Sequence, residues 1–215
     1  MKILVVGDSC LDTFIYGDIE RIAPEAPVPV IKPKYKKENG GMAANVVANL
    51  KSLGAEVDLI TNSTLIKKIR FVDERYNQMV LRVDENDFCN RINFKDITFE
   101  GEKKSLKTSS LNSDYINKNY NAIVISDYCK GFLTEEDIEK FTSYDVPTFL
   151  DTKKFLGNYC NNVEEVSVKD VSGAGDTFIA GLVFEYVKSK NIEKAINFAQ
   201  ECTTKVVQKS GVSTI

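Results

Sequence analysis

The sequence contains no histidine, and no two of its cysteines are separated by only two residues. The absence of histidine excludes Ser-His-Asp and Cys-His catalytic groups and any metal site with imidazole ligands. The cysteine spacing excludes a Cys-x-x-Cys zinc or redox pair. An odd number of five scattered cysteines is more typical of a reduced cytoplasm than of a disulfide framework.

A strong net charge and a long apolar run are also lacking. The 28 Lys and Arg residues nearly balance 31 Asp and Glu residues, so we expect no nucleic-acid partner and no attraction to an anionic membrane. The first apolar run, Ile3 to Val6, is too short for a signal peptide or a membrane span. The 215 residues are predicted to form a single cytoplasmic domain, 1–215.

Short apolar runs without alternation recur along the chain, which is typical of strands buried on both faces of a parallel sheet. These runs cover residues 2–7, 57–60, 122–125 and 148–150. Helical patterns lie between or after them, at residues 42–53, 134–141, 178–188 and 192–207. Thr134 is predicted to cap the second of these helices. The alternation predicts an α/β fold, a three-layer sandwich with a mainly parallel sheet.

Two stretches, around 12–38 and 65–93, interrupt that alternation. The first carries every proline except Pro147, which excludes a helix and favours an extended edge segment. In the second, residues 78–83 alternate as a strand does. We predict that the two stretches together form a small β lid beside the main sheet. The polar stretch from Asn86 to Asn119 is predicted to be a loop.

The segment Gly173-Ala174-Gly175-Asp176 opens directly into an apolar helix. Two glycines allow a tight turn in which consecutive N–H groups converge at a helix N-terminus and form an anion hole. Asp176, in the first turn, could then remove a proton from an attacking hydroxyl while the amides hold a transferring phosphoryl group. The alternative is that Asp176 only stabilises its own helix and the glycines only form the turn.

A second Gly-rich segment, Asn39 to Asn45, also opens into a helix. Gly40 and Gly41 let the backbone approach a ligand, and the Asn45 amide offers both a donor and an acceptor. Asp8 and Asp12 follow the first strand, where open α/β sheets bind ligands, and could bind sugar hydroxyls. The alternatives are a plain turn with a solvated Asn45, and a carboxylate that merely caps a turn.

These motifs together resemble those of the ribokinase-like (PfkB-type) family of sugar kinases. The family's Gly-Gly signature with its following asparagine matches Gly40, Gly41 and Asn45, and its Asp-x-x-Gly-Ala-Gly-Asp loop matches residues 170–176. Within the family, the chain most resembles the kinases that phosphorylate heptose 7-phosphate at the anomeric hydroxyl. The segments that carry this likeness are 7–12, 21–30, 81–84 and 126–131.

The resemblance implies a ribokinase-like fold with a substrate-covering lid, and it implies roles for individual residues. Asp176 would be the catalytic base, with an anion hole formed by Gly173, Ala174 and Gly175. The sugar-binding residues would be Asp12, Gly40, Gly41 and Asn45, and the nucleotide-binding residues Ser172, Gly173 and Gly175. ATP and Mg²⁺ are the implied co-substrate and cation, and no residue is assigned as a metal ligand.

The five arginines all lie within the first 91 residues, mostly in the predicted lid. A guanidinium fork suits phosphate, and we expect Arg82 to bind the phosphate that a sugar substrate already carries. Lys130 and Lys153 follow strand ends and are further candidates for substrate binding. The alternative for each of these cations is a solvated surface position.

The chain departs from the family pattern between Asp151 and Asp170, where only 18 residues intervene. A parallel crossover alone needs a dozen or more residues, and the family's Asn-x-x-Glu and Thr-x-Gly-x-x-Gly segments are missing. We expect no nucleotidyltransferase domain to follow. We expect an ATP-dependent kinase of a sugar or sugar phosphate. The alternatives are a sugar-binding or regulatory relative with an incomplete nucleotide site, and a truncated chain that folds poorly. A homodimer is one way to cover exposed sheet edges.

Overall fold

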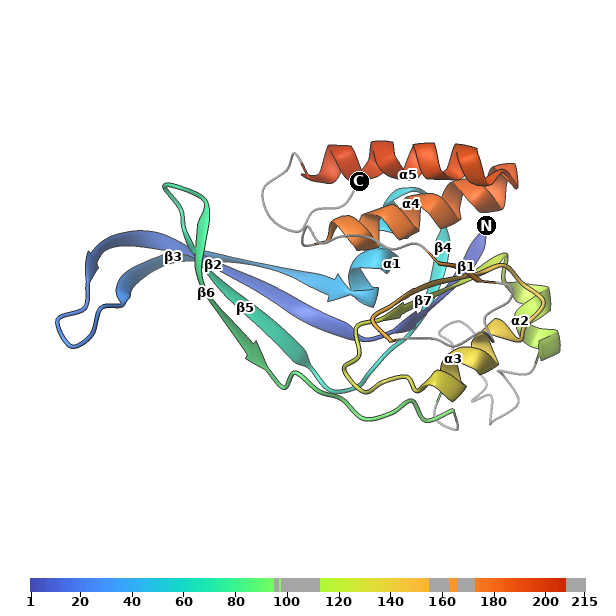
Figure 1. The fold of residues 1–215 in the computed structure, drawn as a ribbon, viewed down its shortest axis with the longest axis horizontal. Helices are drawn as coiled ribbons and strands as arrows, with labels where there is room; N and C mark the ends of the chain where they lie inside the picture. The colour runs from blue at the N-terminus through green and yellow to red at the C-terminus, as the bar shows by residue number, and fades with distance from the viewer. Residues whose placement is uncertain (95–96, 98–112, 155–162, 166–172, 208–215) are drawn as a thin grey trace.

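The computed structural model describes residues 1–94, 97, 113–154, 163–165 and 173–207 (Figure 1). Its main sheet has five strands in the order β4-β1-β7-β8-β9, and every neighbouring pair is parallel. The strands are β1 (Lys2–Gly7), β4 (Glu56–Ile60), β7 (Ala122–Asp127), β8 (Thr148–Thr152) and β9 (Val163–Glu165). The four predicted apolar runs all lie in this sheet, which confirms the parallel α/β prediction.

Helices cover both faces of the main sheet and complete three layers (Figure 1). On one face lie α1 (Ala43–Ser52), α4 (Ala174–Ser189) and α5 (Ile192–Val207), and on the other lie α2 (Ser113–Asn119) and α3 (Glu135–Thr142). Alternate residues of β1 therefore face two different cores. Ile3 and Val5 pack with the first group, and Leu4 packs with the second. Burial on both faces is the reason that residues 3–6 of β1 are uniformly apolar.

A second sheet of four strands extends from this body as a curved arm (Figure 1). Its strands are β2 (Ser9–Ile22), β3 (Pro29–Met42), β5 (Ile66–Asp73) and β6 (Gln78–Glu85), in the order β3-β2-β5-β6. Pro29 and Pro33 lie in β3, at the edge of the sheet, where a missing N–H leaves no ladder bond unmade. The two stretches predicted to form a lid thus meet in this second sheet.

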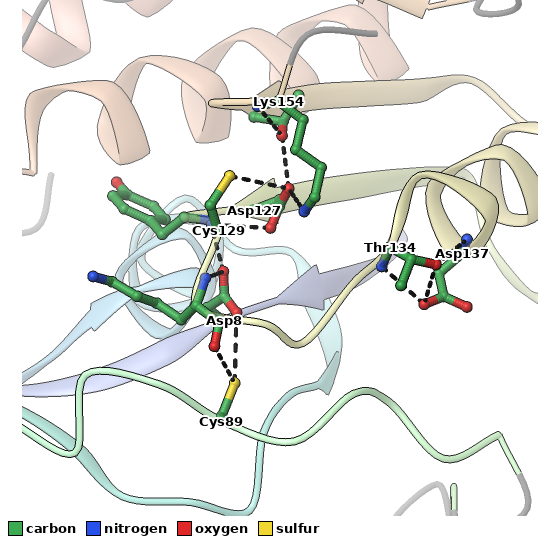
Figure 2. A network of polar contacts seen from close by, with 10 residues as sticks. Asp8, Cys89, Asp127, Cys129, Thr134, Asp137 and Lys154 are labelled. Carbon is green, nitrogen blue, oxygen red and sulfur yellow. Dashed lines mark hydrogen bonds and ion pairs between the residues drawn. The ribbon is translucent and has the colours of Figure 1, made fainter.

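The structure tests two helix predictions, the cap of α3 and the start of α4. Thr134 caps α3 as predicted: its hydroxyl accepts the Asp137 N–H at 3.3 Å and its own N–H donates to the Asp137 carboxylate at 2.9 Å (Figure 2). Helix α4 begins at Ala174, four residues before the predicted start. The prediction began too late because the first turn of the helix carries no apolar repeat.

The prediction of a loop from Asn86 to Asn119 is wrong at its end, where α2 occurs. Ile116 is the only residue of α2 that is buried, so no apolar repeat marks this helix in the sequence. The rest of that polar stretch lies largely outside the described residues. Between β8 and α4 the structure describes only residues 153–154, β9 and Gly173, and the rest of the shortened segment lies outside the described residues. None of the described helices has the length and apolar character needed to cross a membrane.

The end of β1 requires a glycine. A Cβ atom on Gly7 would lie 1.8 Å from the carbonyl oxygen of Ser126 in β7. We therefore expect Gly7→Ala to lower the free energy of unfolding by about 3 kcal/mol, measured by urea denaturation. The control is Gly54→Ala, which has open space and a φ of 90°, and should cost only about 1 kcal/mol. Equal losses in the two variants would contradict the close approach of β1 and β7.

Candidate active site

A cavity of about 170 Å³ lies where the second sheet meets the carboxyl ends of β7 and β8 and the start of α4. The carboxyl ends of parallel strands are the usual position of ligands in open α/β sheets. Its lining consists of Asp12, Met42, Lys68, Arg70, Arg82, Tyr128, Lys130, Lys153, Gly173 and Asp176. Six of these residues are predicted from the sequence, and the cavity brings them together from distant segments of the chain.

Asp176 lies in the first turn of α4 with only 3% of its surface exposed. The Asn45 side-chain amide donates to Oδ2 of this carboxylate at 3.0 Å, and the Tyr128 hydroxyl donates to Oδ1 at 2.8 Å. Burial raises the pKa of Asp176 to about 7, although both hydrogen bonds act in the opposite direction. A carboxyl group that exchanges its proton near neutral pH at the wall of a cavity is suited to acid–base chemistry.

The described start of α4 leaves backbone N–H groups available at the N-terminus of the helix. Gly173 has a φ of 84°, in the left-handed region that favours glycine, and no side chain caps the helix. The N–H groups of Ala174 and Gly175, in the first turn, have no partner within the helix. The positive end of a 16-residue helix therefore faces the cavity beside Asp176. Ser172 lies outside the described residues.

Gly40 and Gly41 do not line the cavity, but they allow close packing of the residues next to it. A Cβ atom on Gly41 would lie 2.1 Å from Oδ2 of Asp12, so the glycine makes room for that carboxylate. A Cβ atom on Gly40 would meet the side chain of Ala44 at 2.8 Å. Asn45 is 2% exposed and turns to Asp176, so the alternative of a solvated Asn45 is wrong.

Asp12 is buried and forms an ion pair with Arg70 of β5. Arg70 and Lys68 are not predicted from the sequence, although β5 carries a signal that could reveal them. Both occupy the buried face of the strand together with Ile66 and Val72. Charged residues at buried strand positions need a partner of opposite charge. Lys68 and Arg70 can therefore be identified as candidate site residues once the inward face of β5 is known.

Arg82 and Lys130 line the cavity as expected, and each already has an acidic partner. The Arg82 guanidinium donates to both oxygens of Asp84, at 2.7 and 2.6 Å. The Lys130 ammonium group donates to Asp87 at 2.6 Å. These carboxylates neutralise much of the positive charge that the two side chains bring to the cavity.

A buried carboxylate network holds the loop after β7 in place (Figure 2). Asp8 is fully buried, and its Oδ2 accepts the Tyr128 N–H at 2.7 Å and the Lys130 N–H at 3.4 Å. Asp127 accepts from Lys154 and from the Thr152 hydroxyl. Asp8 thus stabilises a turn, which is the alternative to sugar binding considered from the sequence. Its hydrogen bonds hold Tyr128 and Lys130 at the cavity wall.

The described residues contain no group of three or more acidic, cysteine or histidine side chains that could hold a metal ion. Mg²⁺ in phosphoryl-transfer sites is commonly held by one or two carboxylates together with substrate phosphates and water. The described residues therefore do not form a dedicated magnesium site, and no catalytic step is assigned to a protein-bound metal.

Comparisons with known proteins agree with this architecture. The model of the family described as "pfkB family carbohydrate kinase" matches residues 156–215. The "Bifunctional protein HldE" of Campylobacter jejuni is 32% identical over 225 residues, covering 93% of this chain and 45% of that protein. The chain thus spans about half the length of the curated relatives it matches.

Two solved structures show the same fold. The "Possible 1-phosphofructokinase" of Thermotoga maritima aligns with a TM-score of 0.60 at 12% identity, over 100% of this chain and 94% of that one. The nucleoside kinase of Methanocaldococcus jannaschii, a member of the ribokinase family, aligns with a TM-score of 0.54 at 16% identity, over 98% and 93%. With the sequence relatives, these likenesses lead to one conclusion: the chain belongs to the pfkB family of carbohydrate kinases and has the ribokinase-like fold.

Proposed function

We propose that this protein is an ATP-dependent kinase of a sugar or sugar phosphate, with the anomeric hydroxyl of heptose 7-phosphate as the best candidate acceptor. The observation that carries the proposal is the Asp176 carboxyl group, which lies at the cavity wall beside the N-terminus of α4. Family membership supports the carbohydrate class, and the resemblance of the sequence to heptose 7-phosphate kinases supports the choice of sugar.

In the proposed reaction, Asp176 removes the proton from the acceptor hydroxyl. The oxygen then attacks the γ-phosphorus of ATP, and the bond to the bridging oxygen breaks so that ADP leaves with that electron pair. Each Asp176 oxygen accepts one hydrogen bond from the protein, so each retains a lone pair for the substrate. The amides of Gly173, Ala174 and Gly175 hold the transferring phosphoryl group.

The remaining site residues position the two substrates. We propose that Asp12, whose carboxylate occupies the space that Gly41 leaves, binds sugar hydroxyls, and that Asn45 holds the Asp176 carboxylate in place. The candidates for the anionic part of the sugar substrate are Arg82, Lys130 and Lys153. ATP supplies the phosphoryl group, and Mg²⁺ bound to its phosphates neutralises their charge.

A second candidate function is a sugar-binding or regulatory relative that does not turn over. The observation that favours it is the short segment between Asp151 and Asp170, where the family carries nucleotide-linked motifs. ADP release measured against a panel of sugars and sugar phosphates separates the two. Turnover supports the kinase, whereas saturable sugar binding without turnover supports the second candidate.

The base assignment predicts the behaviour of Asp176→Asn. Loss of general-base catalysis should lower kcat by about 1,000-fold, while the dissociation constant for the sugar changes by no more than about two-fold. Steady-state kinetics and calorimetric sugar binding measure the two effects. The matched control is Glu185→Gln, on the same helix, which should retain normal activity. Full activity in Asp176→Asn would refute the assignment.

The hydrogen bond from Tyr128 predicts a shift in pH dependence. Because the base must be ionised and burial raises the pKa of Asp176 to about 7, kcat/KM should rise with pH through about 7 and level off above it. Tyr128→Phe removes a hydrogen-bond donor that favours the ionised form of Asp176. The rise of kcat/KM with pH should therefore move to higher pH by about one unit.

The control for this shift is Tyr76→Phe, because Tyr76 is an exposed tyrosine that does not line the cavity. Its pH profile should match that of the wild type. If the rise of kcat/KM in Tyr128→Phe occurs at the wild-type pH or at a lower pH, the Tyr128 hydroxyl does not assist ionisation of Asp176.

A further inference from the structure

Three ion pairs neutralise most of the cations that line the cavity. The pairs are Arg70 with Asp12, Arg82 with Asp84 and Lys130 with Asp87. Two lining lysines remain, because neither Lys68 nor Lys153 forms an ion pair within the described part of the chain. The cavity lining therefore includes two ammonium groups that form no ion pair among the described residues, together with the carboxyl group of Asp176.

Lys68 is the more informative of the two, because only 8% of its surface is exposed. It belongs to the buried face of β5, and the residue opposite it on β6 is Asp84. That carboxylate accepts two hydrogen bonds from Arg82 and forms no ion pair with Lys68. The carboxylates opposite Lys68, Asp12 and Asp84, already form ion pairs with Arg70 and Arg82, so the buried ammonium group is available to an anion that enters the cavity.

Both lysines lie against the same aromatic ring. The ammonium nitrogen of Lys68 is 5.5 Å from the centroid of Tyr128, and that of Lys153 is 5.4 Å from it. These are cation–π distances, and both side chains line the same cavity, so an anion bound there would be attracted to both ammonium groups. Because the Tyr128 hydroxyl donates to Asp176, such an anion would lie beside the proposed base.

We propose that Lys68 and Lys153 together bind a phosphate group in this cavity, with Lys68 as its principal ligand. Two ammonium groups match the charge of a phosphate dianion, and charge-assisted hydrogen bonds to phosphate are strong. The inference rests on the proposed function, in which two phosphoryl groups have this chemistry. One is the phosphate that the sugar already carries, and the other is the group transferred from ATP.

Inorganic phosphate is the first probe, measured by titration calorimetry at constant ionic strength. Lys68→Met keeps the length of the side chain and removes its charge, so it should raise the dissociation constant for phosphate by at least about 10-fold. The control is Lys67→Met, the adjacent lysine, which pairs with Glu85 and does not line the cavity. Its dissociation constant should match that of the wild type. Equal phosphate affinity in Lys68→Met and the wild type would overturn the proposal.

The melting temperature without ligand checks that the variant folds. Lys68→Met should melt at the wild-type temperature or above, because it removes a buried charge that lacks an ion-pair partner. Phosphate should raise the melting temperature of the wild type and leave that of Lys68→Met unchanged. If Lys68→Met does not fold, Lys153→Met gives the same test, because Lys153 is exposed at the cavity rim. Wild-type phosphate affinity in Lys153→Met would then overturn the proposal.

Displacement of bound phosphate identifies its source. Displacement by heptose 7-phosphate, but not by the free heptose, assigns the site to the phosphate of the sugar substrate. Displacement by a non-hydrolysable ATP analogue assigns it to the transferred group. Either result supports the proposal, and failure of both compounds to displace phosphate overturns it. Because phosphate binding needs no turnover, an inactive protein would refute the proposed function without refuting this anion site.

Discussion

The whole site depends on keeping the Asp176 carboxylate buried and hydrogen-bonded. That requires three distant segments to meet: α4 supplies the carboxylate, α1 supplies Asn45, and the loop after β7 supplies Tyr128. The loop in turn is held by Asp8, at the end of β1, which accepts two of its backbone N–H groups. The raised pKa of Asp176 follows directly from this burial, and a carboxylate whose pKa lies near 7 can take up a proton at neutral pH.

The second sheet supplies most of the positive charge at the cavity. In β5 the residues alternate between the two faces, so Lys68 and Arg70 point the same way. The parallel register then sets Asp12 of β2 opposite Lys68, while its carboxylate pairs with Arg70. The second sheet thus contains two ion pairs at the cavity, Arg70 with Asp12 and Arg82 with Asp84. Lys68, in the same sheet, forms no ion pair among the described residues and is available to a ligand. Its cations suit an anionic substrate better than a neutral sugar.

Apart from Lys153, the polar groups of the site lie outside the part of the chain that is short. The site's polar groups come from the first 130 residues, from Lys153 and from the start of α4 at residues 173–176. Between Asp151 and Asp170 the structure describes residues 152–154 and β9. A short connection there affects the walls of a nucleotide site more directly than the base and its hydrogen bonds. This separation is the physical reason to favour a kinase over an inactive relative.

The sequence by itself determined the apolar strands, the capped α3 and the Gly-rich entry to α4, because each depends on residues that are neighbours in the chain. Helix α2 escaped prediction since a single buried residue marks no period. Only the tertiary structure decided which cations are paired: Asp84 engages Arg82, whereas Lys68 has no ion-pair partner among the described residues. Strand register and loop position set those distances, and Coulomb attraction depends on distance in space rather than on separation along the chain.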